Sequence, residues 1–216
     1  MSRRGPKPGE FEEPKQARTR EQLARILEVT DELFAERGYQ ATKIADIAKA
    51  VPCSISTIYD RFGGKAELLR YMHRQGAEEA VALIGALDPQ GEATGDLREV
   101  LPQAVRMGIT ILRRYRGRRR ASLELMHVDP ELAALELANM EQLALAGQRF
   151  LFAYRRQFQH PDPELAAQQA MRLLMAMTEQ HGSSLPTPAS GQLDEDRFVR
   201  EVTRMTLAYL GVPRDY

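Results

Sequence analysis

The stretch that decides the fold of this chain is residues 53–65, CSISTIYDRFGGK. It begins near Ser54, a residue type that caps helix N-termini, and it closes on two glycines, which commonly end a helix. Between them, Ile55, Ile58 and Phe62 recur at the spacing of one helical face, which predicts that all three point inward. A helix this short is not stable alone in water. A neighbouring structure must therefore hold it, and its polar face is left for another use.

Two helices are predicted directly before this stretch. Residues 20–38 show one apolar stripe and end on Gly38, a helix stop signal. Thr42 is then predicted to cap a second helix, KIADIAKA, which ends before Pro52 because proline lacks an N–H and disfavours helical angles in the preceding residue. Two short helices joined by VPC and braced by a longer helix indicate a helix-turn-helix. In that motif the second helix enters the major groove of DNA.

The rest of the chain shows helical periods and no strand pattern. Asp162 and Pro163, for example, are typical of the cap and first position of a helix. The further helices are predicted at residues 65–87, 96–115, 118–128, 130–159, 163–181 and 194–211. We therefore expect an all-α protein of about nine helices. The expected domains are a flexible arm (1–15), a helix-turn-helix domain (16–64) and a larger helical domain (65–216).

The composition narrows the function class. Lys+Arg and Asp+Glu balance at 30 each, so net charge says nothing about a nucleic-acid partner. A single cysteine, Cys53, excludes a disulfide within the chain and a multi-cysteine metal site. The histidines have no metal-ligand spacing and no nucleophile motif is present, so we expect no enzyme, metal or cofactor. No apolar run is long enough to span a membrane and no secretory signal is present, so a cytoplasmic protein is expected.

Residues 18–70 strongly resemble the N-terminal domain of TetR-family transcriptional regulators. The resemblance runs through ARILEVTDELFAERGYQATKIADIAKA, the turn, and STIYDRFGGKAELL. The remaining chain resembles the family only in its architecture of longer helices. The resemblance implies a ligand-responsive repressor that binds a pseudo-palindromic operator as a homodimer and leaves it when a small molecule binds the second domain. The alternative is an all-α ligand-binding or scaffold protein that has lost sequence-specific DNA binding.

The resemblance implies DNA contacts at five positions: Thr42, Thr57, Tyr59, Arg61 and Lys65. The start and outward face of the short helix add Ser54, Ser56 and Asp60 as candidates. Hydroxyls and cations suit phosphates, whereas Asp60 repels them, so Asp60 either reads a base or pairs with a neighbouring cation such as Arg61. The chain departs from the family at Pro52, where the turn usually has glycine. Ile55 and Ser56 occupy variable positions that help to set operator preference.

The second domain is expected to bind the effector and the second subunit. Methionine adapts to irregular apolar ligands, so a largely apolar or aromatic effector is expected. The candidate pocket residues are Met107, Met126, His127, Met140, Phe150, Tyr154, Met171 and Met175. The last two long helices are expected to pair across a twofold axis as a four-helix bundle. The candidate interface residues are Met171, Leu174, Phe198, Val202, Met205 and Tyr209.

Four features allow more than one interpretation. Cys53 is either a redox switch or, as free cysteine usually is, a small core residue. The arginine-rich segment 113–120 either binds an anion or DNA, or is a solvated corner at a helix C-terminus. Arg3 and Arg4 either enter a minor groove or belong to a disordered arm. The loop 182–193 either gates the pocket or only connects helices.

Overall fold

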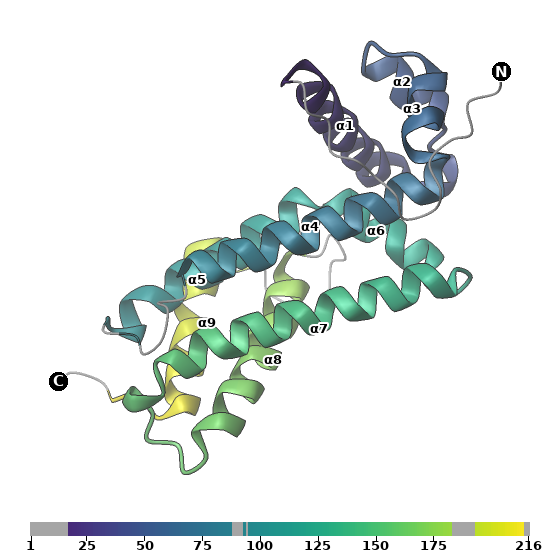
Figure 1. The fold of residues 1–216 in the computed structure, drawn as a ribbon. Coiled ribbons are helices and arrows are strands. Elements are labelled where there is room, and N and C mark those ends of the chain that lie inside the picture. The colour runs from purple at the N-terminus through teal and green to yellow at the C-terminus, as the bar shows by residue number, and fades with distance from the viewer. Residues whose placement is uncertain (1–16, 88–92, 94, 183–192, 214–216) are drawn as a thin grey trace. The chain divides into compact units, whose positions relative to one another are not determined.

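The computed structural model describes residues 17–87, 93, 95–182 and 193–213 (Figure 1). All regular structure in these ranges is helical, which confirms the all-α prediction. The helices are α1 (Ala17–Ala41), α2 (Ile44–Ala50), α3 (Ile55–Phe62), α4 (Lys65–Leu87), α5 (Leu97–Arg114), α6 (Arg116–Leu125), α7 (Pro130–Ala153), the 3₁₀ turn η1 (Arg155–Gln157), α8 (Pro163–Gly182) and α9 (Glu195–Leu210). None of the described helices is long and apolar enough to cross a membrane. The arm with Arg3 and Arg4, and most of the loop 182–193, lie outside the described residues.

Several helix ends follow the local signals of the sequence. Gly38 adopts a φ of 81°, which favours glycine and interrupts α1 near its C-terminal end. Gly63 adopts a φ of 78° at the C-cap of α3. The Asp162 carboxylate accepts a hydrogen bond from the Leu165 N–H at 3.0 Å, which confirms the predicted cap of α8.

The contacts divide the chain into two compact units, Met1–Gly76 with Tyr115–Asn139, and Ala77–Arg114 with Met140–Tyr216. The first unit brings α6 against α1, although the two helices are far apart in sequence. The compact units do not follow the expected domain boundary after residue 64, because α6 packs with the N-terminal helices. A functional boundary at that residue stays a prediction.

Two carboxylates, from Asp31 of α1 and Glu124 of α6, hold α6 to α1 in the first unit. The Asp31 carboxylate accepts hydrogen bonds from the N–H groups of Gly117 and Arg118, at 3.1 and 2.7 Å, and thereby caps the start of α6. In return, the Glu124 carboxylate accepts from the N–H groups of Tyr39 and Gln40, at 3.0 and 3.2 Å. The free N–H groups at the start of α6 attract an anion, which Asp31 supplies, and Glu124 satisfies two N–H groups just after the interruption of α1 at Gly38.

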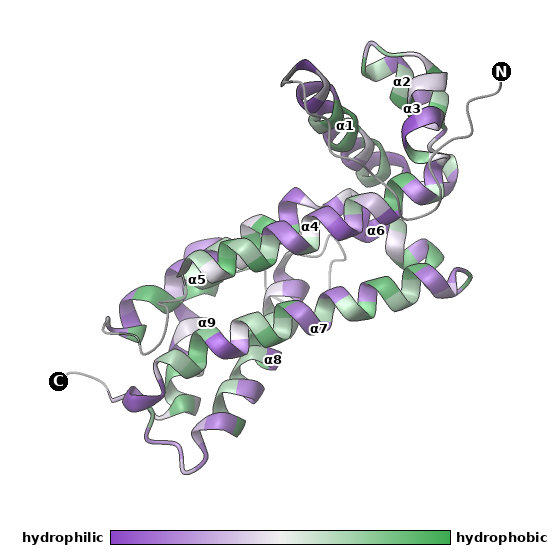
Figure 2. Cartoon of the chain, viewed as in Figure 1, coloured by the Kyte–Doolittle hydropathy of each residue, from purple (hydrophilic) through white to green (hydrophobic). Residues whose placement is uncertain are grey.

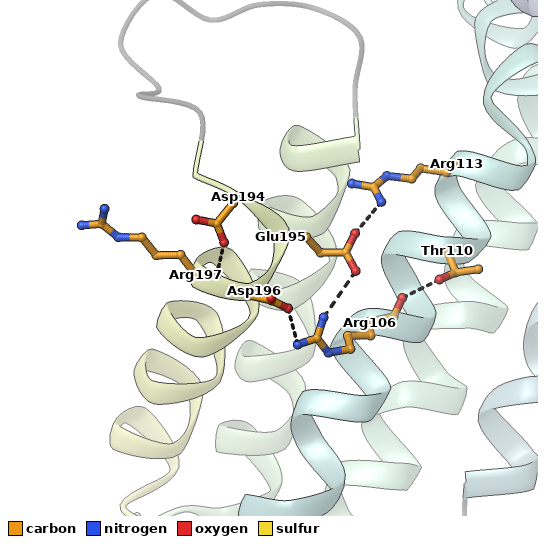
Figure 3. Close-up of polar contacts among 7 residues, drawn as sticks. All are labelled: Arg106, Thr110, Arg113, Asp194, Glu195, Asp196 and Arg197. Atoms are coloured by element: carbon orange, nitrogen blue, oxygen red, sulfur yellow. Dashed lines mark hydrogen bonds and ion pairs between the residues drawn. The ribbon is translucent and has the colours of Figure 1, made fainter.

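The second unit packs α5, α8 and α9 around an apolar core. Figure 2 shows both hydrophobic and hydrophilic residues along the visible parts of these helices. Ion pairs join α5 to the start of α9: the Arg106 guanidinium donates to Asp196 at 2.7 Å, and Arg113 pairs with Glu195 (Figure 3). The Asp194 carboxylate caps α9 by accepting from the Arg197 N–H at 2.8 Å.

Candidate nucleic-acid interface

The core of the first unit positions α3 through two of its apolar residues. Ile58 is fully buried and Phe62 is 5% exposed, and both pack into the cluster formed with α1, α2 and α4. The Phe62 ring lies against Tyr71 of α4, with ring centroids 5.5 Å apart. This apolar contact supplies the support that a helix of eight residues lacks on its own.

The N-terminus of α3 is capped by a group of hydroxyls. The Ser54 hydroxyl accepts a hydrogen bond from the Thr57 N–H at 3.1 Å, which confirms the predicted cap. The same oxygen lies 2.8 Å from the hydroxyls of both Ser56 and Thr57. These three hydroxyls therefore form one local network at the start of the helix.

The outward face of α3 was expected to carry Ser56, Thr57, Asp60 and Arg61. Ser56 and Asp60 are exposed as expected, Thr57 and Arg61 are partly buried, and Tyr59 is also exposed. Ile55 was expected to point inward, but 46% of its surface is exposed. The prediction was wrong because the core contact of this short helix ends at Ile58, one turn further on.

The two charged residues of the face have different surroundings. Among the described residues, the Asp60 carboxylate forms neither an ion pair nor a hydrogen bond, so nothing in this part of the structure competes with a base for it. One guanidinium nitrogen of Arg61 is buried and makes no hydrogen bond to the described residues. A buried donor of this kind favours an acceptor supplied from outside the chain.

The structure does not place Thr42 on this surface. Thr42 is fully buried, and its hydroxyl donates to the carbonyl of Gly38 at 2.8 Å. The N-cap of α2 is Lys43, whose N–H donates to the Asp46 carboxylate at 3.0 Å. The expectation that Thr42 caps α2 was wrong, because its hydroxyl closes the preceding turn instead, and its burial removes it from the candidate DNA contacts.

Lys65 lies at the start of α4 but uses much of its ammonium group within the chain. It donates to the carbonyls of Tyr39 and Thr42, at 2.6 and 2.7 Å. The ammonium nitrogen also lies 4.1 Å from the centroid of the Tyr39 ring. Burial lowers the pKa of Lys65. Lys65 therefore braces the turn between α1 and α2, and an ammonium with three donors keeps at most one of them for a phosphate.

Replacing Lys65 by methionine is expected to lower the free energy of unfolding by about 1–3 kcal/mol, because two carbonyls lose their donor. Chemical denaturation of the two proteins measures the difference. If Lys65 acts only as a phosphate contact, the variant would instead keep its stability and show a shallower salt dependence of DNA binding.

Cys53 packs against the core of the first unit and is partly buried. Burial raises the pKa of its thiol, which favours the unreactive protonated form. These observations support the interpretation of Cys53 as a core residue.

The predicted effector residues are divided between the two compact units. Met126 and His127 belong to the first unit, and His127 is exposed just after α6. The other six belong to the second unit, where Met140 is 42% exposed and Met107, Met171 and Met175 are partly buried. Phe150 and Tyr154 are buried and pack edge to face, with ring centroids 5.6 Å apart.

Half of the predicted interface residues are in the core of their own chain. Leu174, Phe198 and Val202 are buried within the second unit, so they were wrongly predicted to face another subunit. Met171 and Tyr209 are partly buried, and only Met205 is well exposed. The apolar residues that α8 exposes are instead Leu165 and Leu173.

The arginine-rich segment 113–120 is largely engaged within the chain. Arg114 pairs with Glu79 at 2.9 Å, and Arg113 pairs with Glu195. The guanidinium of Arg118 donates to the carbonyl of Met72, and that of Arg120 donates to the carbonyl of Ala35. Arg113, Arg114 and Arg120 nevertheless stay exposed, so the segment is a solvated corner whose arginines also have partners within the chain.

Comparison with known proteins identifies the helix-turn-helix. Residues 26–72 match the family described as bacterial regulatory proteins, tetR family. The chain carries a tetR-family N-terminal domain. No curated protein matches the sequence.

Solved structures of similar fold cover 89–90% of this chain. A bacterial regulatory protein of the tetR family from Rhodococcus RHA1 is 22% identical over 89% of this chain and 98% of its own, with a TM-score of 0.66. The fatty acid degradation regulator FadR from Bacillus halodurans is 22% identical over 89% and 100%, with a TM-score of 0.65. A protein described as a transcriptional regulator, from Saccharomonospora viridis in complex with choline, is 21% identical over 90% and 99%, with a TM-score of 0.69. The family match identifies the DNA-binding type of domain at residues 26–72, and these structures share the fold of the chain.

Proposed function

We propose that this tetR-family protein is a cytoplasmic homodimeric repressor that binds a pseudo-palindromic operator and leaves it when a small, largely apolar or aromatic effector binds. The observation that carries the DNA-binding part is the outward face of α3, where Ser56, Tyr59 and Asp60 are exposed on a helix held from behind by Ile58 and Phe62. Hydroxyls contact base edges and phosphates, and a carboxylate can accept a hydrogen bond from cytosine N4.

Exposed apolar side chains on α8 and α9 support the dimer. Leu165 and Leu173 of α8, and Met205 of α9, are each more than two-fifths exposed, although these helices also bury a full apolar stripe in their own unit. A second copy that pairs its α8 and α9 with these helices would cover them across a twofold axis. Two copies would then present their α3 helices to successive major grooves.

The second unit supports a small-molecule site through its side-chain chemistry. It combines the buried rings of Phe150 and Tyr154 with the partly buried methionines Met107, Met171 and Met175. One of the similar structures contains choline, which shows that a protein of this fold holds a small organic molecule. An effector lowers DNA affinity only as far as it prefers the conformation that does not bind DNA.

The test is selection of bound fragments from genomic DNA of the source organism by the purified protein, followed by sequencing. We expect one palindromic motif. Its affinity should fall in Tyr59→Phe and Arg61→Ala, and Arg61→Ala should make the plot of log affinity against log salt shallower by about 1 per protomer if the guanidinium contacts a phosphate. Arg149→Ala removes an exposed arginine of α7 in the other unit and serves as the matched control, with unchanged binding.

A selection that returns no shared motif, from protein refolded to remove bound ligand, would contradict the regulator. It would favour the alternative of a ligand-binding or scaffold protein without sequence-specific DNA binding.

A further inference from the structure

An apolar side chain lies on the otherwise polar outward face of α3. Ile55 is 46% exposed, whereas Ile58 on the same helix is fully buried. Next to it are the hydroxyl of Ser56 and, one turn further on, the carboxylate of Asp60. Ile55 is not part of the core cluster of the first unit. Its exposed surface can therefore be buried only by a binding partner.

The position of Ile55 on the helix suits contact with DNA bases. It is the first residue of α3, and helical side chains lean toward the N-terminus of their helix. In a helix-turn-helix, the N-terminal residues of the second helix reach the base edges. Ile55 and the exposed Tyr59 are four residues apart and therefore share one face.

The chemistry of the major groove offers one apolar group to such a side chain. Guanine, cytosine and adenine present donors and acceptors there, whereas thymine presents its C5-methyl group beside an acceptor. Covering a donor or acceptor with an aliphatic chain leaves that group without a hydrogen bond, which is unfavourable. An isoleucine at this place therefore favours thymine through apolar contact and disfavours the other bases through desolvation.

The neighbouring hydroxyls strengthen this assignment. Ser56 and Thr57 both contact the hydroxyl of Ser54 at 2.8 Å, so the polar groups around Ile55 are held in one local network. Ile55 is thus a large, exposed apolar side chain at the start of the helix, outside the core cluster of the described residues. We propose that Ile55 reads the C5-methyl group of a thymine in each half of the operator, a specificity that rests on the proposed function.

The test uses the operator duplex recovered by the selection above and replaces single thymines by deoxyuridine, which lacks only the methyl group. At one position per half-site, the substitution is expected to weaken binding of the wild-type protein about fourfold, and about 15-fold when both halves carry it. Ile55→Ala is expected to bind the normal operator more weakly and to show no further loss with deoxyuridine. Ile55→Val keeps a branched aliphatic chain and should retain most of the sensitivity.

Two controls separate the methyl contact from other effects. Deoxyuridine in the flanking sequence outside the half-sites should leave the affinity unchanged. The circular dichroism spectrum of Ile55→Ala should match that of the wild type, because the side chain is outside the core.

The outcomes also separate this inference from the function on which it rests. Site-specific binding without a penalty at any thymine of the half-sites would overturn the role of Ile55 and leave the regulator intact. If deoxyuridine weakens binding equally in the wild type and in Ile55→Ala, another residue makes the methyl contact. That result would also overturn the role of Ile55. If the wild type shows no site-specific binding, the proposed function fails and the inference fails with it.

Discussion

Replacing Gly117 by alanine is expected to lower the free energy of unfolding by about 3 kcal/mol or more, which corresponds to a fall of roughly 6–12 °C in melting temperature. A Cβ atom at this position would lie 1.8 Å from the carbonyl oxygen of Asp31 and 2.8 Å from the backbone nitrogen of Ala35. Both atoms belong to the backbone of α1, so no side-chain rotation can relieve the clash. The added methyl group must push α6 away from α1 and lengthen the hydrogen bonds to the Asp31 carboxylate.

The matched control is Gly108→Ala, in the middle of α5, where a Cβ atom would meet nothing within 4 Å. Alanine costs less backbone entropy than glycine in a helix, so this variant is expected to gain roughly 0.5–1 kcal/mol. Thermal unfolding of both variants beside the wild type measures the two opposite shifts. An unchanged melting temperature in Gly117→Ala would contradict the close approach of the two backbones.

Acidification from pH 7.5 to 5 is expected to lower the free energy of unfolding through His73. The ring is 3% exposed, its Nδ1 lies 2.8 Å from the Glu136 carboxylate of α7, and its Nε2 lies 2.5 Å from the Ser122 hydroxyl of α6. Next to the carboxylate, Nδ1 carries the proton, so Nε2 accepts from the hydroxyl. Burial lowers the pKa of His73, Arg118 of α6 lowers it further, and Glu136 opposes both.

The direction of the effect follows from that shift. With the pKa of His73 lowered in the folded state, the unfolded chain takes up the proton first, so stability is lost as the pH falls below the ordinary histidine value of about 6.5. One group that titrates between pH 6.5 and 5 can account for a loss of at most about 2 kcal/mol. Burial acts to raise the pKa of Glu136, but the contact with His73 outweighs burial and the pKa is lowered. Protonation of Glu136 therefore also lowers the free energy of unfolding, but only at more acid pH, below about 4.5.

Denaturation curves at several pH values test this expectation. His73→Gln keeps a donor and an acceptor at the site but does not titrate, so its unfolding free energy should change less between pH 7.5 and 5. His181→Gln controls for the other histidine with a lowered pKa, which burial and Arg113 cause. Equal pH slopes in the wild type and His73→Gln would contradict the assignment.

Much of the fold could be predicted because its signals are local. Gly38, Ser54 and the pair Asp162 and Pro163 act within one turn of the chain, and the structure places helix boundaries near each of them. Short-range sterics and caps of this kind do not depend on what the rest of the chain does. The same holds for part of the polar face of α3, where the exposure of Ser56 and Asp60 follows from helical spacing.

The candidate site could be predicted only in part, because burial depends on the neighbours. Ile55 and Ile58 have the same chemistry, yet only Ile58 reaches the core. Thr42 has the residue type of an N-cap, but its hydroxyl finds the carbonyl of Gly38 across a turn. The sequence does not indicate which groups the Lys65 ammonium contacts. In the folded chain it donates to two carbonyls of the α1–α2 turn.

The sequence by itself determined the number of helices, most of their ends and the helix-turn-helix, since each depends on residues within a turn or two of one another. Only the tertiary structure decided which apolar face meets which partner. The stripe with Leu174, Phe198 and Val202 is covered by its own unit, and α6 packs on α1 through Gly117 and Asp31. Helical periodicity shows that a face is apolar, but the burial of that face depends on contacts between segments that are distant in the chain.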